Sequence, residues 1–246
     1  MRIFGRQHEL TELVKGISGS RSFLIYGPAG VGKTRLFEEL APQFPHLIRI
    51  SSCKTPEALF HDLALELWRQ PNHILRDHFR SSEQLEASTA ASLKSLCISA
   101  MQGAENVLAL EHLGFSSQHL FQAVKEFSWH TGAAVVYVSR SCHVEEAGYL
   151  VGHYPDSADR VEIAPFKPHQ AAEFANLAAD ELRLQAENRT EFLAKVGELS
   201  EGNPGAILAM VRMAGMPKYR IGDWIKSGSL YIDFRLAANA ALSSND

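Results

Sequence analysis

One stretch of this chain decides its fold: Gly27-Pro28-Ala29-Gly30-Val31-Gly32-Lys33-Thr34. It has the pattern G-x-x-x-x-G-K-[ST], with a short apolar run before it (22–26) and a helix-period run after it (31–40). The glycines permit backbone angles that a Cβ atom would obstruct, so successive N–H groups can point at phosphate oxygens. The following helix adds its positive N-terminal end. A glycine-rich turn that arose by chance would rarely have a strand before it and a helix after it. The stretch therefore predicts a phosphate-binding loop.

Each residue type in the loop has a role toward a nucleoside triphosphate. Lys33 can reach the β- and γ-phosphates, and the hydroxyl of Thr34 can bind Mg²⁺. The guanine-reading pattern N-K-x-D is absent, which favours adenine, so the expected cofactors are ATP and Mg²⁺. The expected nucleotide-binding residues here are Gly27, Pro28, Ala29, Gly30, Val31, Gly32, Lys33, Thr34 and Arg35.

The rest of the chain predicts an α/β fold with a helical end. Apolar runs alternate with helix-period segments up to Pro165, which is typical of a parallel sheet with helices on both faces. We expect a three-layer α/β/α core in residues 1–165 and a small all-helical lid domain with a C-terminal tail in residues 166–246. The five strands are predicted at 22–26, 46–50, 107–110, 133–138 and 161–163. Helices are predicted at 31–40, 56–68, 72–102 with a break near 80–83, 117–127, 168–182, 188–199, 205–214, 218–226 and, more weakly, 231–242.

Composition sets the broad class. The 246 residues carry a net charge of −4, which argues against a generally basic surface for nucleic acid. Three widely spaced cysteines form no C-x-x-C pair, and a reducing compartment suits them. The N-terminus does not have a secretory pattern, and no stretch approaches the apolar length of a membrane span. We therefore expect a soluble, cytoplasmic protein that does not bind membranes.

Three further motifs surround the loop. Phe4-Gly5-Arg6 with Glu9-Leu10 precedes it, Val136-Tyr137-Val138-Ser139-Arg140 ends the fourth predicted strand, and Gly202-Asn203-Pro204 lies near the C-terminus. With the loop, they resemble the AAA+/STAND group of P-loop ATPases, particularly origin-recognition-like and archaeal-type ATPase domains.

The resemblance implies a role for each motif. Phe4, Gly5 and Arg6 would help to seat the adenine, and Pro204 would pack near the base. Ser139 and Arg140 would sense the γ-phosphate. Other interpretations exist: a surface turn for the first motif, and a helix stop followed by a helix start for the last, which is compatible with the family role.

The acidic motif departs from the family pattern. The apolar strand ends in Glu111-His112, where the family has Asp followed by an acid, usually Glu. The natural alignment places Glu111 at the metal position and His112 at the position of the water-activating base, where a histidine is a poorer acceptor. A shifted register would instead make Glu111 the base and leave Leu110 at the metal position. His112 can also be a solvent-facing residue. The expected catalytic residues are Lys33, Glu111, His112 and Arg140, with Thr34 and Glu111 as metal ligands.

The lid departs as well, because Gly205 stands where many relatives carry an arginine that points at the γ-phosphate. An intact loop beside these departures predicts a nucleotide-dependent switch or assembly ATPase with weak hydrolysis, whose partners are ATP or ADP, copies of itself and an unidentified protein. A DNA-transaction ATPase is the first alternative, although DNA is not the favoured partner. A nucleotide-stabilised scaffold that docks a protein on 72–102 or the C-terminal tail is the second.

Overall fold

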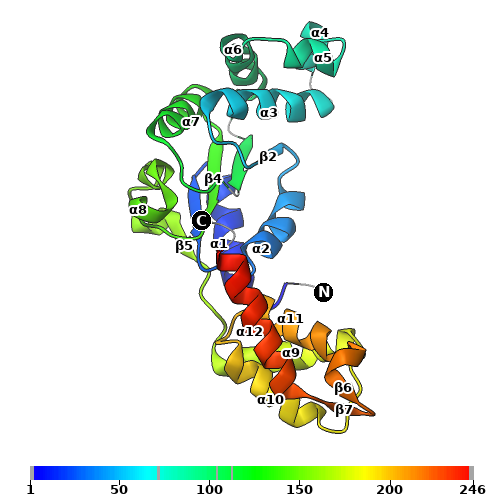
Figure 1. Ribbon diagram of the computed structural model, residues 1–246. Coiled ribbons are helices and arrows are strands. Elements are labelled where there is room, and N and C mark those ends of the chain that lie inside the picture. Colours follow the sequence, from blue (N-terminus) through cyan, green and yellow to red (C-terminus); the bar gives the residue numbers. More distant parts are fainter. Residues whose placement is uncertain (1–2, 71–72, 104, 112, 244–246) are drawn as a thin grey trace. The chain divides into compact units, whose positions relative to one another are not determined.

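The computed structural model describes residues 3–70, 73–103, 105–111 and 113–243 (Figure 1). The chain divides into two compact units. The larger unit comprises Arg6–Pro28 and Lys33–Ile163, and the smaller comprises Met1–Gly5, Ala29–Gly32 and Ala164–Asp246. The middle of the glycine-rich loop therefore groups with the C-terminal residues. The domain assignment 1–165 and 166–246 stays a prediction.

The larger unit is built on one sheet. Its strands are β1 (Phe23–Tyr26), β2 (Leu47–Ser51), β3 (Val107–Glu111), β4 (Ala134–Ser139) and β5 (Arg160–Glu162). They pair in the order β2-β3-β4-β1-β5, and every pairing is parallel. All residues of β3 and β4 are buried, as expected for central strands covered on both faces. The predicted five-stranded parallel sheet is confirmed.

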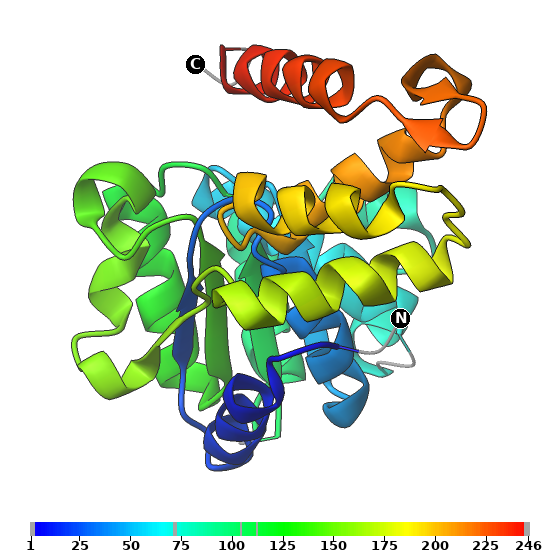
Figure 2. The same cartoon turned by 90° about the horizontal axis from the view of Figure 1, so that it is seen from below.

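Helices cover both faces of this sheet, and Figures 1 and 2 show the strands between them. Leu24, Leu108 and Val135 pack with residues of α3 and α7 in one hydrophobic core. Phe23 points to the other face, where it packs so closely on Gly16 of α1 that a Cβ atom there would lie 2.2 Å from its ring. The helices are α1 (Gln7–Ser18), α2 (Lys33–Leu40), α3 (Pro56–Arg69), α4 (His73–His78), α5 (Ser82–Glu86), α6 (Ala90–Ala100), α7 (Gln118–Thr131) and α8 (Val144–Ala147), with short 3-10 turns at Ala41–Gln43, Tyr149–His153 and Ser157–Asp159.

The predicted helical region 72–102 consists of three helices. The expected break precedes α5, and a second break that we did not predict precedes α6. Both helices have N-caps: Ser81 accepts a hydrogen bond from Gln84 N, and Thr89 accepts one from Ser92 N. Thr55 caps α3 in the same way, by accepting from Ala58 N at 3.2 Å.

The smaller unit has its own hydrophobic core. Phe166, Phe174, Phe192, Ile207 and Met210 are buried in it. Its helices are α9 (Pro168–Glu181), α10 (Arg189–Leu199), α11 (Pro204–Ala214) and α12 (Ser227–Ser243).

This unit is mainly helical, as predicted, but one short segment of it is not. The expected helix 218–226 is a 3-10 turn at Pro217–Tyr219 followed by a β-hairpin, β6 (Arg220–Ile221) and β7 (Trp224–Ile225). Gly222 at the hairpin turn has φ +56°, a left-handed conformation that suits glycine. Asn188 also holds the hairpin, because its side chain accepts from Ile225 N at 2.9 Å and donates to Ile225 O at 3.0 Å. That anchor is remote in sequence, so local periodicity could not show it.

Candidate functional site

The parallel pairing brings four strand ends to one edge of the sheet. Tyr26 at the end of β1 pairs with Ser139 at the end of β4, and Val138 pairs with Glu111 at the end of β3. Glu111 also pairs with Ser51 of β2. The start of the glycine-rich loop, Arg140 and Glu111 therefore lie at the carboxyl edge, where ligands of such sheets bind.

The loop backbone has the conformation that its glycines permit. Gly30 has φ +81° and Gly32 has φ +99°. At Gly32 a Cβ atom would meet nothing within 4 Å, so that glycine is needed for its backbone angle rather than for space. The helix α2 begins directly afterwards at Lys33. The loop thus leads into a helix N-terminus, as anion-binding loops do.

Lys33 folds back on its own loop. Its Nζ donates to the carbonyl oxygens of Gly27 at 2.6 Å and Pro28 at 2.8 Å. Burial, together with the smaller effect of the positive charge of Arg140, lowers the pKa of Lys33 to about 8. The structure therefore places two of the predicted site residues, Lys33 and Arg140, within electrostatic reach of each other. Two such cations favour a polyanionic ligand.

Glu111 is completely buried and ion-paired to a residue that sequence reasoning missed. Its Oε2 accepts from Nε of Arg49 at 2.6 Å, and Arg49 also stacks over the ring of Phe37 with 5.0 Å between the guanidinium carbon and the ring centroid. Phe37 belongs to α2, so Glu111 is on the face of the sheet that the loop helix covers. No sequence pattern marks Arg49, because its partner lies 62 positions away.

The other carboxylate oxygen of Glu111 is suited to a cation. Oε1 is buried and has no hydrogen-bond partner among the described residues. Thr34, the other predicted metal ligand, has an exposed side chain at the start of α2. Three or more His, Cys, Asp or Glu side chains do not gather anywhere in the described part of the chain. Mg²⁺ commonly takes only one or two protein ligands, with water and phosphate completing its shell, so these residues fit that ion.

The remaining predicted residues of this edge differ in their surroundings. Ser139 is buried, and its Oγ accepts a hydrogen bond from Ser141 N at 3.3 Å. Arg35 pairs with Glu38 at 3.0 Å and Glu39 at 2.6 Å on the exposed surface of α2. His112 lies outside the described residues.

The N-terminal motif is divided between the two units. In the smaller unit, the ring of Phe4 packs on Phe166 and Phe174 with centroid separations of 5.5 and 5.6 Å. In the larger unit, the buried Arg6 pairs with Glu9 at 3.2 Å. These residues have clear packing roles, and their contact with adenine stays a prediction.

The motif Gly202-Asn203-Pro204 separates two helices of the smaller unit. Gly202 has φ +76°, and a Cβ atom there would lie 2.1 Å from the carbonyl oxygen of Phe166. Asn203 caps α11, and the buried Pro204 occupies its first turn. The interpretation as a helix stop and start therefore agrees with the geometry. The sequence analysis did not predict that Asn203 and Gly205 contact the glycine-rich loop. An Asn-Pro pair indicates the start of a helix, but it does not indicate which distant segment that start will contact.

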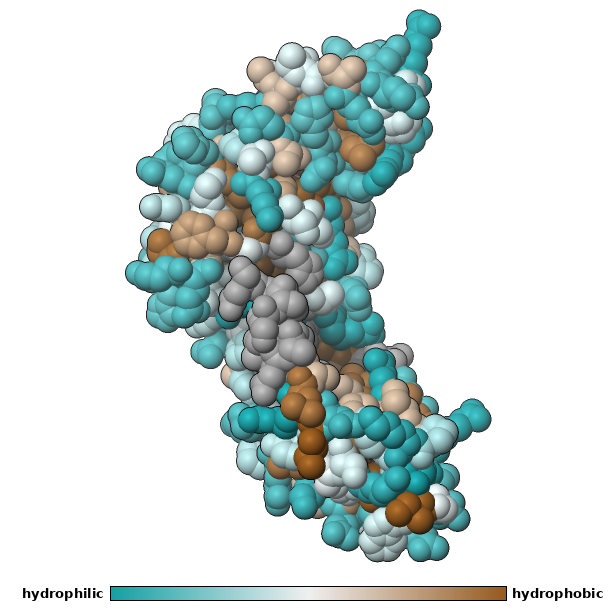
Figure 3. Space-filling model, in the orientation of Figure 1, coloured by the Kyte–Doolittle hydropathy of each residue, from teal (hydrophilic) through white to brown (hydrophobic). Residues whose placement is uncertain are grey.

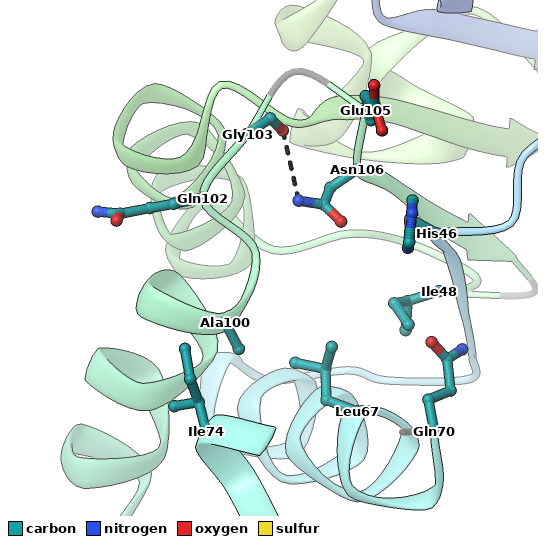
Figure 4. Close-up of a pocket in the computed structure, with 10 residues that line it drawn as sticks. All are labelled: His46, Ile48, Leu67, Gln70, Ile74, Ala100, Gln102, Gly103, Glu105 and Asn106. Carbon is teal, nitrogen blue, oxygen red and sulfur yellow. Dashed lines mark hydrogen bonds between the residues drawn. The ribbon is translucent and has the colours of Figure 1, made fainter. Parts of the chain in front are cut away.

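A cavity elsewhere in the larger unit contains none of the predicted site residues. It has a volume of about 460 Å³ and lies where β2 and β3 begin, at the sheet edge opposite the loop (Figure 4). Polar groups of His46, Gln70 and Asn106 and the apolar side chains of Ile48 and Leu67 line it.

The hydropathy of the surface and of the helices bears on contact with membranes. The face shown in Figure 3 is mostly hydrophilic, with scattered hydrophobic residues. Within the described ranges, no helix has both the length and the apolar character that crossing a bilayer requires.

Residues 3–112 match the family of novel STAND NTPases designated nSTAND6. No curated protein matches the chain. Among solved structures, a Walker-type ATPase of Pyrococcus abyssi is similar at 16% identity and a TM-score of 0.64, over 99% of this chain and 74% of that one. Orc1 of Aeropyrum pernix in complex with DNA is similar at 12% identity and a TM-score of 0.64, over 96% and 66%. The replication initiator DnaA, bound to AMPPCP and single-stranded DNA, is similar at 15% identity and a TM-score of 0.59, over 88% and 63%.

At these identities the likeness shows a shared fold. The chain spans slightly less than two thirds of the Orc1 and DnaA chains, at 66% and 63%. The matched family region includes the glycine-rich loop and Glu111.

Proposed function

We propose that this chain is an AAA+/STAND-type P-loop ATPase, which binds ATP with Mg²⁺ and acts as a nucleotide-dependent switch or assembly ATPase with weak hydrolysis. One observation carries the proposal. Lys33 follows a glycine-rich loop with positive φ at Gly30 and Gly32 and lies within electrostatic reach of Arg140, whereas the acid at the same sheet edge, Glu111, is already ion-paired to Arg49.

Each group has a role in binding. The loop N–H groups and the N-terminus of α2 would bind phosphate oxygens. Lys33 would exchange its two loop carbonyls for the β- and γ-phosphates, and Arg140 would contact the γ-phosphate. Thr34 and Oε1 of Glu111 would hold Mg²⁺, which supplies positive charge to the phosphates when it is bound.

Weak hydrolysis follows from the surroundings of the acid. A general base must accept a proton from the attacking water. In Glu111, Oε2 already accepts a hydrogen bond from Arg49, so the buried Oε1 is the single carboxylate oxygen left for a further ligand. Glu111 therefore suits the metal position better than the position of the base.

Binding and turnover test this function directly. A fluorescent, non-hydrolysable ATP analogue should bind the wild-type protein, and Lys33→Ala should weaken binding strongly. Lys15→Ala is the matched control, because it also removes one lysine, but from the exposed surface of α1. It should leave the affinity for the analogue unchanged. Turnover should stay below about 1 per second, the lower end of common enzyme rates. A wild-type protein that does not bind the analogue would contradict the function, and turnover of several per second would contradict weak hydrolysis.

A DNA-transaction role is the second candidate, because two of the similar structures are described as DNA complexes. Backbone contacts to DNA release counterions, so binding must weaken steeply as salt rises. Filter binding at low and high salt, with and without the analogue, tests the candidate. Sizing the protein under the same conditions tests self-association, and no retained DNA at low salt would eliminate the DNA role.

A further inference from the structure

The side chain of Asn203 joins the start of α11 to the middle of the glycine-rich loop. Its Oδ1 accepts from Gly205 N at 3.0 Å and Ala206 N at 3.2 Å, which caps the helix. Its Nδ2 donates to the carbonyl oxygen of Ala29 at 2.7 Å. Gly205 N also donates to the carbonyl oxygen of Gly30 at 2.9 Å. We call these four residues, Ala29, Gly30, Asn203 and Gly205, the loop–α11 contact, and all of them belong to the smaller unit.

The loop–α11 contact requires a glycine on each side. A Cβ atom on Gly30 would lie 2.6 Å from Oδ1 of Asn203. A Cβ atom on Gly205 would lie 3.0 Å from both Cα and the carbonyl oxygen of Gly30. The close approach gives a physical reason for the small residue here, because a larger one would push against the loop backbone.

The contact restrains two peptide planes of the loop. A peptide unit is planar and trans, so its C=O and N–H groups point in opposite directions. When Nδ2 of Asn203 binds the carbonyl of Ala29, it also directs the N–H of Gly30. When Gly205 N binds the carbonyl of Gly30, it directs the N–H of Val31. Both N–H groups belong to the segment whose amides are expected to bind phosphate.

We propose that Asn203 is a positioning residue for phosphate binding, which orients the N–H groups of Gly30 and Val31 through the opposite ends of their peptide planes. This inference rests on the proposed ATP binding and adds to it a partner of the loop outside the known motif. A phosphate bound to these N–H groups polarises the same peptide units and strengthens their carbonyls as acceptors. By linkage, nucleotide binding and the loop–α11 contact stabilise each other.

A pair of substitutions separates positioning from helix capping. Asn203→Ser keeps a good N-cap but removes the amide donor to Ala29. Asn203→Ala removes both. We expect both variants to bind the ATP analogue about tenfold more weakly, equal to about 1.4 kcal/mol. Only Asn203→Ala should also lose the stability of the cap, measured by urea unfolding. Inorganic tripolyphosphate should show the same loss, because the effect acts on phosphates rather than on the base.

Two further measurements complete the test. Thr55→Ala removes the cap of α3, so it should lower stability without changing affinity for the analogue. In hydrogen exchange, the analogue should slow exchange of the Gly205 amide in the wild type and have a smaller effect in Asn203→Ser.

The outcomes distinguish this inference from the proposed function. If the wild type binds the analogue and Asn203→Ser binds it within about twofold of the wild type, the positioning role is wrong and ATP binding stands. If the loss occurs with the analogue but not with tripolyphosphate, the positioning role is also wrong. If the wild type binds neither ligand, both proposals fail.

Discussion

Nε of Arg49 lies 2.6 Å from Oε2 of Glu111, an acid whose side chain is only 1% exposed. The ion pair joins neighbouring strands at the carboxyl edge of the sheet. It leaves Oε1 of Glu111 without a partner in the described parts of the chain. A buried carboxylate needs compensation on both oxygens, so this pair has consequences for stability and for cation binding.

Removing the arginine should destabilise the protein. Arg49→Met leaves the buried Glu111 carboxylate without its cation, and we expect a loss of about 1–3 kcal/mol in the free energy of unfolding, because Arg49 itself is partly exposed. The double variant Arg49→Met with Glu111→Gln should be more stable than Arg49→Met alone. Urea unfolding measures both. Arg69→Met, which breaks the exposed pair with Glu66, is the control and should change stability by less than about 1 kcal/mol. Equal losses at the two arginines would contradict the prediction.

Cation binding should depend on Glu111 and on the hydroxyl of Thr34. With Mg²⁺ present, we expect Glu111→Gln and Thr34→Val each to weaken binding of the ATP analogue by about tenfold or more. With EDTA present, the two variants should bind it like the wild type, because the lost groups act on the metal. Thr34→Ser keeps a hydroxyl and should behave like the wild type under both conditions. An equal loss with and without Mg²⁺ would show that these residues do not act through a cation.

Affinity for the nucleotide should fall as the solution becomes alkaline. The pKa of Lys33 is about 8 in the free protein, because burial and Arg140 both disfavour the ammonium form. Bound phosphate favours the ammonium form of Lys33 and raises its pKa above the value in the free protein. The affinity is therefore fully present below about pH 8 and is lost as the pH rises above that value. The loss should be at most about tenfold per pH unit. Titrations of the analogue between about pH 7 and pH 10 measure it.

Arg140→Gln tests the cause of that pH dependence. Without the positive charge of Arg140, the pKa of Lys33 should be higher in the free protein, because only burial then lowers it. The decline in affinity should start at a higher pH, although the affinity itself should be lower. Lys15→Ala should keep the wild-type profile. An unchanged midpoint in Arg140→Gln would show that Arg140 does not act on Lys33.

Alanine at two helical glycines should have opposite effects. Gly197 in α10 has room, since a Cβ atom there would be 3.9 Å from its nearest neighbours, and Gly197→Ala should stabilise the protein by about 0.5–1 kcal/mol through helix propensity. Gly205→Ala has the same propensity gain but pushes on Gly30 at 3.0 Å, so we expect a net loss of stability and weaker binding of the analogue. Thermal unfolding and analogue titration compare the two. Stabilisation by both substitutions would contradict the loop–α11 contact.

The sequence predicted those elements whose own residues indicate their burial or their backbone conformation. Apolar runs indicated all five strands, and the loop glycines indicated a backbone that the structure has at Gly30 and Gly32. The predicted helix 56–68 corresponds to α3, which begins at Pro56 as expected. The expected helix 218–226 was wrong, because Gly222 adopts a left-handed turn conformation and because Asn188, which holds the hairpin, is distant in sequence.

The sequence alone determined that a phosphate-binding type of loop follows a buried strand, because a local motif carries both its conformation and its chemistry. The tertiary structure alone determined which distant groups meet it. Asn203 is 174 positions from Ala29, and Arg49 is 62 positions from Glu111. Such pairs depend on how strands and helices pack, and no periodicity or propensity of the separate segments encodes them. The loop could therefore be recognised in the sequence, whereas the contacts that orient its peptide planes and pair its acid could be found only in the fold.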